Sequence, residues 1–151
     1  MAPKFNLQNI LDIRHSRVEA LEIELARLLS IQLKLESQLL LLRENQMGLM
    51  VQLTRMQQGE LDLVAVNLVR YNILQGDDRI RTAKRELAAH QRLVEEKRRE
   101  LVGAKQSEET LRILKQKGIE AFNAEMQLKE ASAQDDIYIA RAYHQRRAEV
   151  Q

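Results

Sequence analysis

The sequence predicts an all-α protein: a long two-helix antiparallel coiled-coil hairpin with unequal arms. Three observations lead to this prediction. The 148 residues that follow Pro3 contain no proline, leucine recurs every seven residues, and the seven-residue pattern changes register once. Composition agrees, with 24 leucines but only five glycines and five aromatic residues. Globular domains of this length use proline and glycine at many turns and aromatic side chains in a thick core, so most β architectures are excluded.

The first helix is expected over about residues 5–57, because two heptad series run through it. One series is Leu21, Leu28, Leu35, Leu42, Leu49, Met56 and Leu63. The companion series is Leu11, Val18, Leu25, Gln32, Leu39, Gln46 and Leu53. The two series alternate at spacings of three and four, which is the a/d seam of a coiled coil. A glutamine in such a seam costs stability and helps to fix the register.

A turn is expected at residues 57–62, where the heptad pattern shifts by three positions. The second seven-residue series is Val66, Ile73, Ile80, Leu87, Val94 and Leu101. The shift falls around Gly59, and a register change at a glycine is typical of a helical hairpin. Residues 75–78, which include Gly76-Asp77-Asp78, are the alternative turn. The second helix is then expected over about residues 62–147, and residues 1–151 are expected to form a single coiled-coil domain.

The two expected arms differ in length, which leaves the end of the second helix without a mate. Antiparallel pairing uses up the first helix by about residue 115, and the seven-residue pattern loses definition beyond that point. Residues 116–147 therefore lack an intrachain partner for much of their length. Such an end is expected to bind a partner from outside.

Charge is nearly balanced over the chain but uneven along it. Lys and Arg number 24 against 22 Asp and Glu, whereas residues 79–117 carry a net charge of +6 and residues 118–136 carry −4. These blocks are either solvated helix faces or a docking surface for an acidic partner. Overall balance and the scarcity of aromatic residues argue against nucleic-acid binding. Without cysteine, a secretory signal or an apolar run of about 20 residues, the chain is expected to be cytoplasmic.

No arrangement of residues indicates catalysis or cofactor binding. His15, His90 and His144 lie at least 54 residues apart, so they lack the close spacing of metal ligands. The five glycines are isolated, so there is no phosphate-binding loop, and the Asp135-Asp136 pair is interpreted as surface charge. The sequence predicts no enzyme, no metal, no cofactor and no small-molecule ligand.

The two ends of the chain carry a further pattern. At the start it consists of Lys4-Phe5-Asn6-Leu7 and Ile10-Leu11-Asp12-Ile13-Arg14. At the far end it consists of Lys129-Glu130, Asp135-Asp136 and Ile139-Ala140-Arg141, where an acidic pair precedes an alanine and an arginine. Together with the hairpin, the length and Tyr71 early in the second helix, these residues resemble the FliJ family of flagellar type III export proteins. The resemblance covers essentially the whole chain.

This resemblance implies a central stalk, similar in architecture to the γ subunit of rotary ATPases. It implies binding to the hexameric flagellar export ATPase, contact with the export-gate membrane protein, and assistance to export chaperones. The implied location is peripheral, at the inner face of the cell membrane at the flagellar base. The implied gate contact falls on Gln38, Leu42, Asn45 and Leu49; Asn45 and Leu49 stand where aromatic residues can occur in the family, and both leucines also fit the coiled-coil seam.

For the ATPase contact we expect the arginines near the paired termini, whose long side chains permit loose contacts. They are Arg14, Arg141, Arg146 and Arg147. The alternative function is a structural or scaffolding coiled coil that self-associates or binds another helical partner. A third reading, electrostatic binding of nucleic acid or anionic membrane by residues 79–117, is disfavoured because acidic residues interleave with the basic ones.

Overall fold

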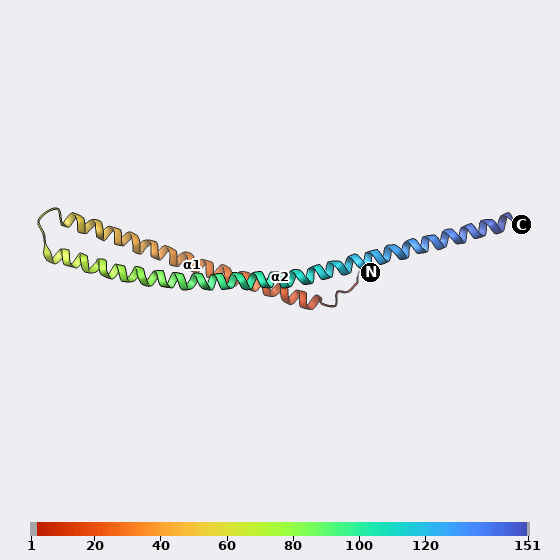
Figure 1. The fold of residues 1–151 in the computed structure, drawn as a ribbon, viewed down its shortest axis with the longest axis horizontal. Helices are drawn as coiled ribbons and strands as arrows, with labels where there is room; N and C mark the ends of the chain where they lie inside the picture. Colours follow the sequence, from red (N-terminus) through yellow and green to blue (C-terminus); the bar gives the residue numbers. More distant parts are fainter. Residues whose placement is uncertain (1–2, 151) are drawn as a thin grey trace. The chain divides into compact units, whose positions relative to one another are not determined.

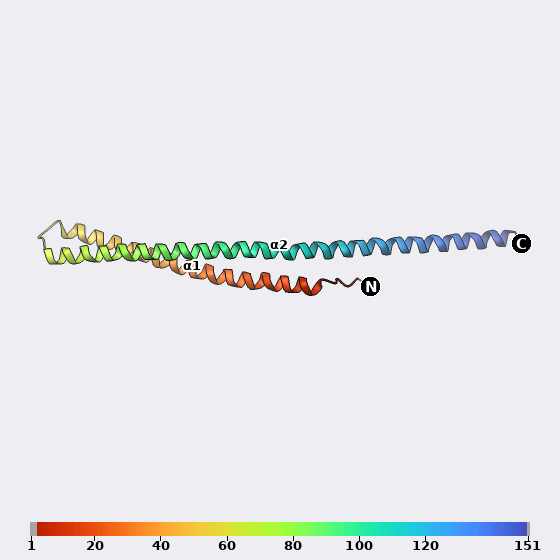
Figure 2. The ribbon, with the colours of Figure 1, turned by 60° about the horizontal axis from the view of Figure 1, so that its bottom comes forward.

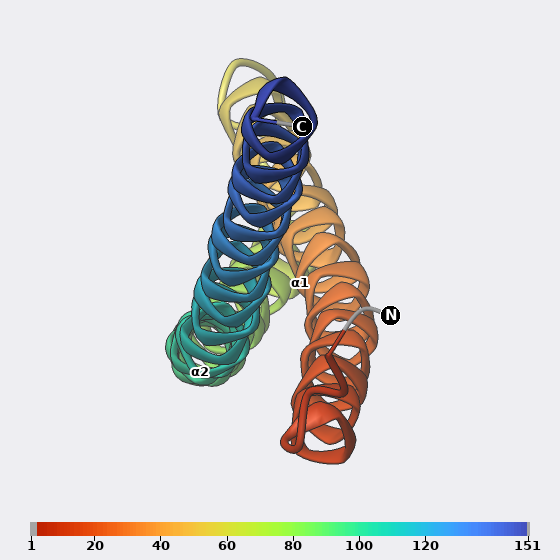
Figure 3. The same ribbon diagram turned by 90° about the vertical axis from the view of Figure 1, so that its right-hand side faces the viewer.

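The computed structural model describes residues 3–150, which form two long helices that pack against each other. The helices are α1 (Gln8–Met56) and α2 (Leu63–Glu149), drawn in Figure 1. Among residues 3–150 there is no strand, and in the end-on view of Figure 3 no third element accompanies the two helices. The predicted all-α fold is confirmed.

Residues 57–62 form the connection between the helices. The last backbone hydrogen bonds of α1 run from Gln57 N to Leu53 O and from Gln58 N to Arg55 O, both 3.2 Å. Asp62 then caps α2, because its Oδ1 accepts hydrogen bonds from the backbone nitrogens of Val64 (3.1 Å) and Ala65 (3.3 Å). No turn forms at residues 75–78, where α2 is continuous.

The residue contacts divide the chain into two compact units. Unit 1 comprises Met1–Ser16 and Ala104–Gln151, and unit 2 comprises Arg17–Gly103. Each unit contains part of α1 and part of α2, and the two helices run antiparallel in unit 2 on either side of the connection (Figures 1 and 2). That residues 1–151 act as a single domain stays a prediction.

The core of unit 2 follows the heptad series. Its buried apolar side chains are Val18, Leu21, Leu39, Val66, Val69 and Val94. Leu21 is the most enclosed of them, with 1% of its surface exposed. Most other seam residues are half-buried, because a pair of helices covers each seam side chain from one side only.

Two polar residues complete this core and fix its register. The Gln46 side chain is buried, and its Nε2 donates hydrogen bonds to Ile73 O and Asp77 Oδ1, both at 2.7 Å. Gly76 makes room for this amide, since a Cβ there would lie 2.9 Å from Gln46 Cδ. On the same seam the buried His90 donates from Nε2 to Leu28 O at 2.6 Å, which fixes the protonated nitrogen because a carbonyl can only accept.

Alanine at two glycines of α2 has opposite expected effects. Gly103→Ala raises the free energy of unfolding by about 0.5 to 1 kcal/mol, because alanine favours helix and nothing lies within 4 Å of the added methyl group. Gly76→Ala displaces the Gln46 amide from two hydrogen bonds. It therefore lowers the free energy of unfolding by about 1 kcal/mol, although alanine has the same advantage in helix propensity here. Urea denaturation of both variants checks this, and equal stabilisation by both would contradict the packing of Gly76 against Gln46.

Candidate functional site

The four residues expected at the export gate lie along one side of α1 in unit 2. Gln38 and Leu42 line one groove of about 360 Å³, and Leu42, Asn45 and Leu49 line an adjoining groove of about 600 Å³. Gln38 and Asn45 are exposed, whereas Leu42 and Leu49 are half-buried because they also belong to the seam. The structure thus brings these four residues together on one continuous surface.

The opposite wall of this surface comes from α2. Tyr71, Asn72, Gln75 and Arg79 line the larger groove, and Gln75 and Arg79 also line the smaller one. Tyr71 is 58% exposed. Sequence reasoning named Tyr71 only as a family feature and missed the other three, because finding them requires the register between the helices. A surface with several side-chain amides can both donate and accept hydrogen bonds, as recognition of a polypeptide requires.

The four expected ATPase-contact arginines do not lie together. Arg14 is half-buried, and its Nη1 donates to Ser107 O at 2.7 Å within unit 1. The other three are exposed near the end of α2, and the nearest, Arg141, lies 34 residues beyond Ser107, about 51 Å along the helix. The expectation of paired termini is wrong, because the first residue of α1, Gln8, is bonded to Lys115, far from the end of α2.

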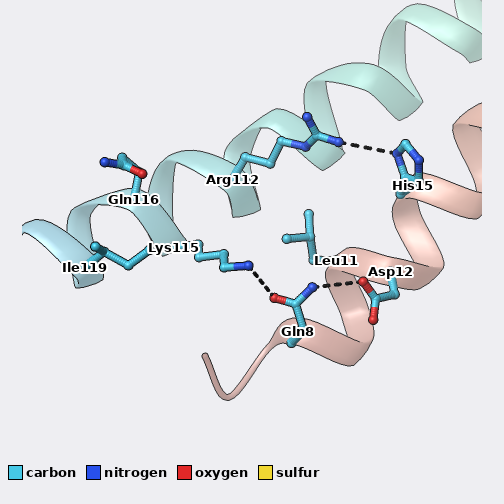
Figure 4. Close-up of a pocket in the computed structure, with 8 residues that line it drawn as sticks. All are labelled: Gln8, Leu11, Asp12, His15, Arg112, Lys115, Gln116 and Ile119. Atoms are coloured by element: carbon cyan, nitrogen blue, oxygen red, sulfur yellow. Dashed lines mark hydrogen bonds between the residues drawn. The ribbon is translucent and has the colours of Figure 1, made fainter. Parts of the chain in front are cut away.

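A cluster of polar side chains joins the two segments of unit 1. Lys115 Nζ donates to Gln8 Oε1 at 2.8 Å, and Gln8 Nε2 donates to Asp12 Oδ1 at 2.9 Å (Figure 4). One turn further along α1, His15 Nδ1 lies 2.7 Å from Glu108 Oε1. Around these residues is a groove of about 520 Å³, and the close-up shows the Leu11 side chain between the two helices.

Glu108 is the centre of this cluster. Its side chain is 9% exposed and accepts hydrogen bonds from His15 and Arg112. A carboxylate can only accept, so His15 Nδ1 carries the hydrogen, although Arg112 Nη2 also approaches it at 3.4 Å. The hydrogen bond from His15 lowers the pKa of the Glu108 carboxyl below its ordinary value of 4.5, burial opposes this shift, and the charge of Arg112 reinforces it.

We expect the contact between the two segments of unit 1 to weaken in acid. Because folding lowers the pKa of Glu108, its stabilisation is complete above about pH 4.5 and is lost as the pH falls through the lower pKa of the folded state. From neutral pH to about pH 3, the protection of the amides of residues 8–16 against hydrogen exchange, measured relative to the intrinsic exchange rate at each pH, should therefore fall more in the unsubstituted protein than in Glu108→Gln. Glu109→Gln, at the exposed neighbouring position, is the control and should follow the unsubstituted protein. An equal loss of protection in all three proteins would contradict this role of Glu108.

The hydrogen bonds of the cluster hold the two segments of unit 1 together. Within residues 3–150, no group of three or more His, Cys, Asp or Glu side chains could hold a metal ion. The same part of the chain contains no helix long and apolar enough to cross a membrane.

The end of α2 beyond the cluster is exposed. Lys115, Ile119 and Phe122 are half-buried, and every residue between 123 and 149 except Ala142 is exposed. The exposed apolar side chains here are Met126, Leu128, Ile137, Tyr138, Ile139 and Tyr143. Residues 123–149 are called the α2 tail below.

One comparison with known proteins gives a match. A family model described as "Flagellar FliJ protein" matches residues 3–148, which confirms the resemblance seen in the two ends of the sequence. No curated protein and no solved structure matches the chain. The match spans both helices, and it includes the two grooves and most of the α2 tail.

Proposed function

The chain belongs to the FliJ family, which implies a role related to flagellar export, and from this premise we propose that it is the non-enzymatic stalk of the hexameric export ATPase. The observation that carries the proposal is the exposed α2 tail. It extends well past the start of α1 within unit 1 and ends in three exposed arginines, Arg141, Arg146 and Arg147. A helix end of this kind is available to a partner without unfolding anything.

Two packed helices suit the interior of a ring. With helix diameters of 10–12 Å, a helix pair is about 20 Å across, and a single helix is narrower still. Two helices cannot present the same face to six identical subunits. Docking therefore makes the subunits inequivalent and favours different nucleotide states in different subunits. In this proposal the ATPase performs the chemistry, and this chain supplies position and asymmetry.

The two grooves of unit 2 are the proposed contact with the export-gate membrane protein. Gln38, Leu42, Asn45 and Leu49 form one wall, and α2 residues including Tyr71 form the other. A gate contact of this kind would place the protein at the inner face of the membrane as a peripheral component. Escort of export chaperones is the third part of the proposal and follows from the family alone.

Assembly and hydrolysis by the purified export ATPase test the proposal. With this chain present, we expect more hexamer in sedimentation and faster ATP hydrolysis. Absence of both effects at every ratio of the two proteins would refute the stalk role. Sedimentation of the chain alone separates the alternative, because a self-associating scaffold forms dimers or larger species whereas a stalk that works singly sediments as a monomer.

A further inference from the structure

The positive charge of unit 2 is concentrated in one band of the helix pair. The band comprises residues 27–42 of α1 and residues 79–94 of α2. Cross-helix neighbours fix this register: His90 is bonded to Leu28 O, and Leu42 lines the same grooves as Arg79. The basic residues of the band are Arg27, Lys34, Arg79, Arg81, Lys84, Arg85 and Arg92. Against these seven stand two acidic residues, Glu36 and Glu86, so the band carries a net charge of +5.

Most of this charge is not neutralised within the protein. Arg81 pairs with Asp78 at 3.3 Å, but no ion pair within residues 3–150 reaches Lys84, Arg85 or Arg92. Elsewhere α2 sets an acidic residue four positions before a basic one, as in the pairs Glu95–Arg99, Glu108–Arg112 and Glu125–Lys129. The band instead places two like charges at this spacing, because Arg85 follows Arg81 by four residues. Like charges at that spacing repel, so the band weakens the isolated helix.

The charges of the band lie on several sides of the helix pair. Arg79 lies in the grooves on one side. Arg85 stands midway between the half-buried seam positions 83 and 87, so it lies on the opposite face of α2, and Arg92 does so one heptad later. A flat lipid surface or a rigid duplex would reach only some of these side chains. A flexible chain can follow them around the pair.

The chemistry of the band also separates the kinds of flexible anion. The sequence has no Phe, Tyr or Trp between Phe5 and Tyr71 or between Tyr71 and Phe122, so the band offers no such ring as a stacking platform for bases. Exposed aliphatic side chains accompany the charges, with Leu33 65% exposed and Leu93 51% exposed. Aliphatic and basic groups together suit a polypeptide better than a phosphate backbone.

We propose that this band binds an extended acidic polypeptide segment, rich in Asp and Glu, from a partner protein. The inference does not depend on the stalk role, because the three charges that the test removes, Lys84, Arg85 and Arg92, line neither groove of the proposed gate contact and lie outside the α2 tail. Binding would neutralise side chains that repel one another in the free protein.

Fluorescence anisotropy with labelled poly-L-glutamate tests the band. The variant Lys84→Gln/Arg85→Gln/Arg92→Gln removes three exposed charges that have no ion-pair partner in the described chain, so its thermal unfolding should be unchanged. The matched control Arg43→Gln/Arg55→Gln/Arg70→Gln removes the same charge from exposed positions outside the band. We expect the band variant to lose about tenfold in affinity at low salt and the control to lose less than about twofold.

Three results would overturn the proposal. Equal losses in the two variants would show that only net charge matters. Tighter binding of oligothymidylate, or of vesicles of equal parts phosphatidylcholine and phosphatidylglycerol, than of poly-L-glutamate would assign the band to nucleic acid or membrane. No binding of poly-L-glutamate even at low salt would show that the band is a solvated face. Stimulation of the export ATPase by the band variant is measured in a separate assay. The proposed stalk role can fail in that assay while poly-L-glutamate still binds to the band.

Discussion

Leu21→Ala lowers the free energy of unfolding by about 3 kcal/mol, the largest stability loss that we expect from any substitution by alanine in this chain. Leu21 is 1% exposed, and alanine leaves a cavity that the packed helices of unit 2 cannot fill by local rearrangement. Urea denaturation followed by circular dichroism measures the loss. The slope of the free energy of unfolding against urea concentration should be unchanged if the variant folds to the same state.

Leu33→Ala is the matched control for Leu21→Ala. Both residues belong to α1, but Leu33 is 65% exposed and its removal should change stability by less than about 0.5 kcal/mol. A loss below about 1 kcal/mol for Leu21→Ala would contradict the seam assignment, because full burial of a leucine is worth more than that.

For the proposed stalk role, Arg141→Glu/Arg146→Glu/Arg147→Glu is expected to abolish stimulation of the export ATPase, with a loss of affinity of about a hundredfold for three reversed charges. All three side chains are exposed in the α2 tail. Reversal removes attraction to the ring and introduces repulsion, whereas unfolding of the paired segments should be unaffected. Hydrolysis assays over a range of concentrations of this chain and at two salt concentrations measure the effect.

The control for the arginine triple variant is Arg43→Glu/Arg55→Glu/Arg70→Glu, which makes the same change in charge within unit 2. It should stimulate the ATPase like the unsubstituted chain. If both triple variants fail equally, the stalk does not use the α2 tail. Arg14→Gln adds a separate comparison, because Arg14 donates a hydrogen bond to Ser107 O. Its loss should lower the stability of unit 1 and have little direct effect on ATPase binding.

The helices and their seam were predictable because they depend on short-range periodicity. A heptad series specifies which side of each helix is buried, and Leu11, Val18, Leu21 and Leu39 are buried as their series requires. The connection at residues 57–62 coincides with the register change. Gly76 was read as part of an alternative turn, but the structure shows its real role, which is to leave space for a glutamine on the other helix.

The contacts between distant segments could not be predicted in the same way. Glu108 and Lys115 are the next two positions of the seven-residue series of α2 after Leu101, but as charged residues they do not reveal in the sequence that the seam continues. The structure shows that they continue it with polar contacts, through His15 and Gln8 on α1. These partners lie 93 and 107 residues away in sequence, and an error of one position in the connection would have changed every such pair.

The α2 tail has a further consequence for how it meets any partner. A short isolated helix is rarely stable in water, because its first turn costs far more than each later residue gains. In this chain the nucleus already exists in the paired part of α2, and the tail only propagates it. A partner therefore captures a preformed helix rather than folding one. The helical structure of the tail also depends on the residues that precede it. A helix-breaking substitution near residue 123 would unfold the whole tail beyond it, whereas one near residue 145 would unfold only the last turn.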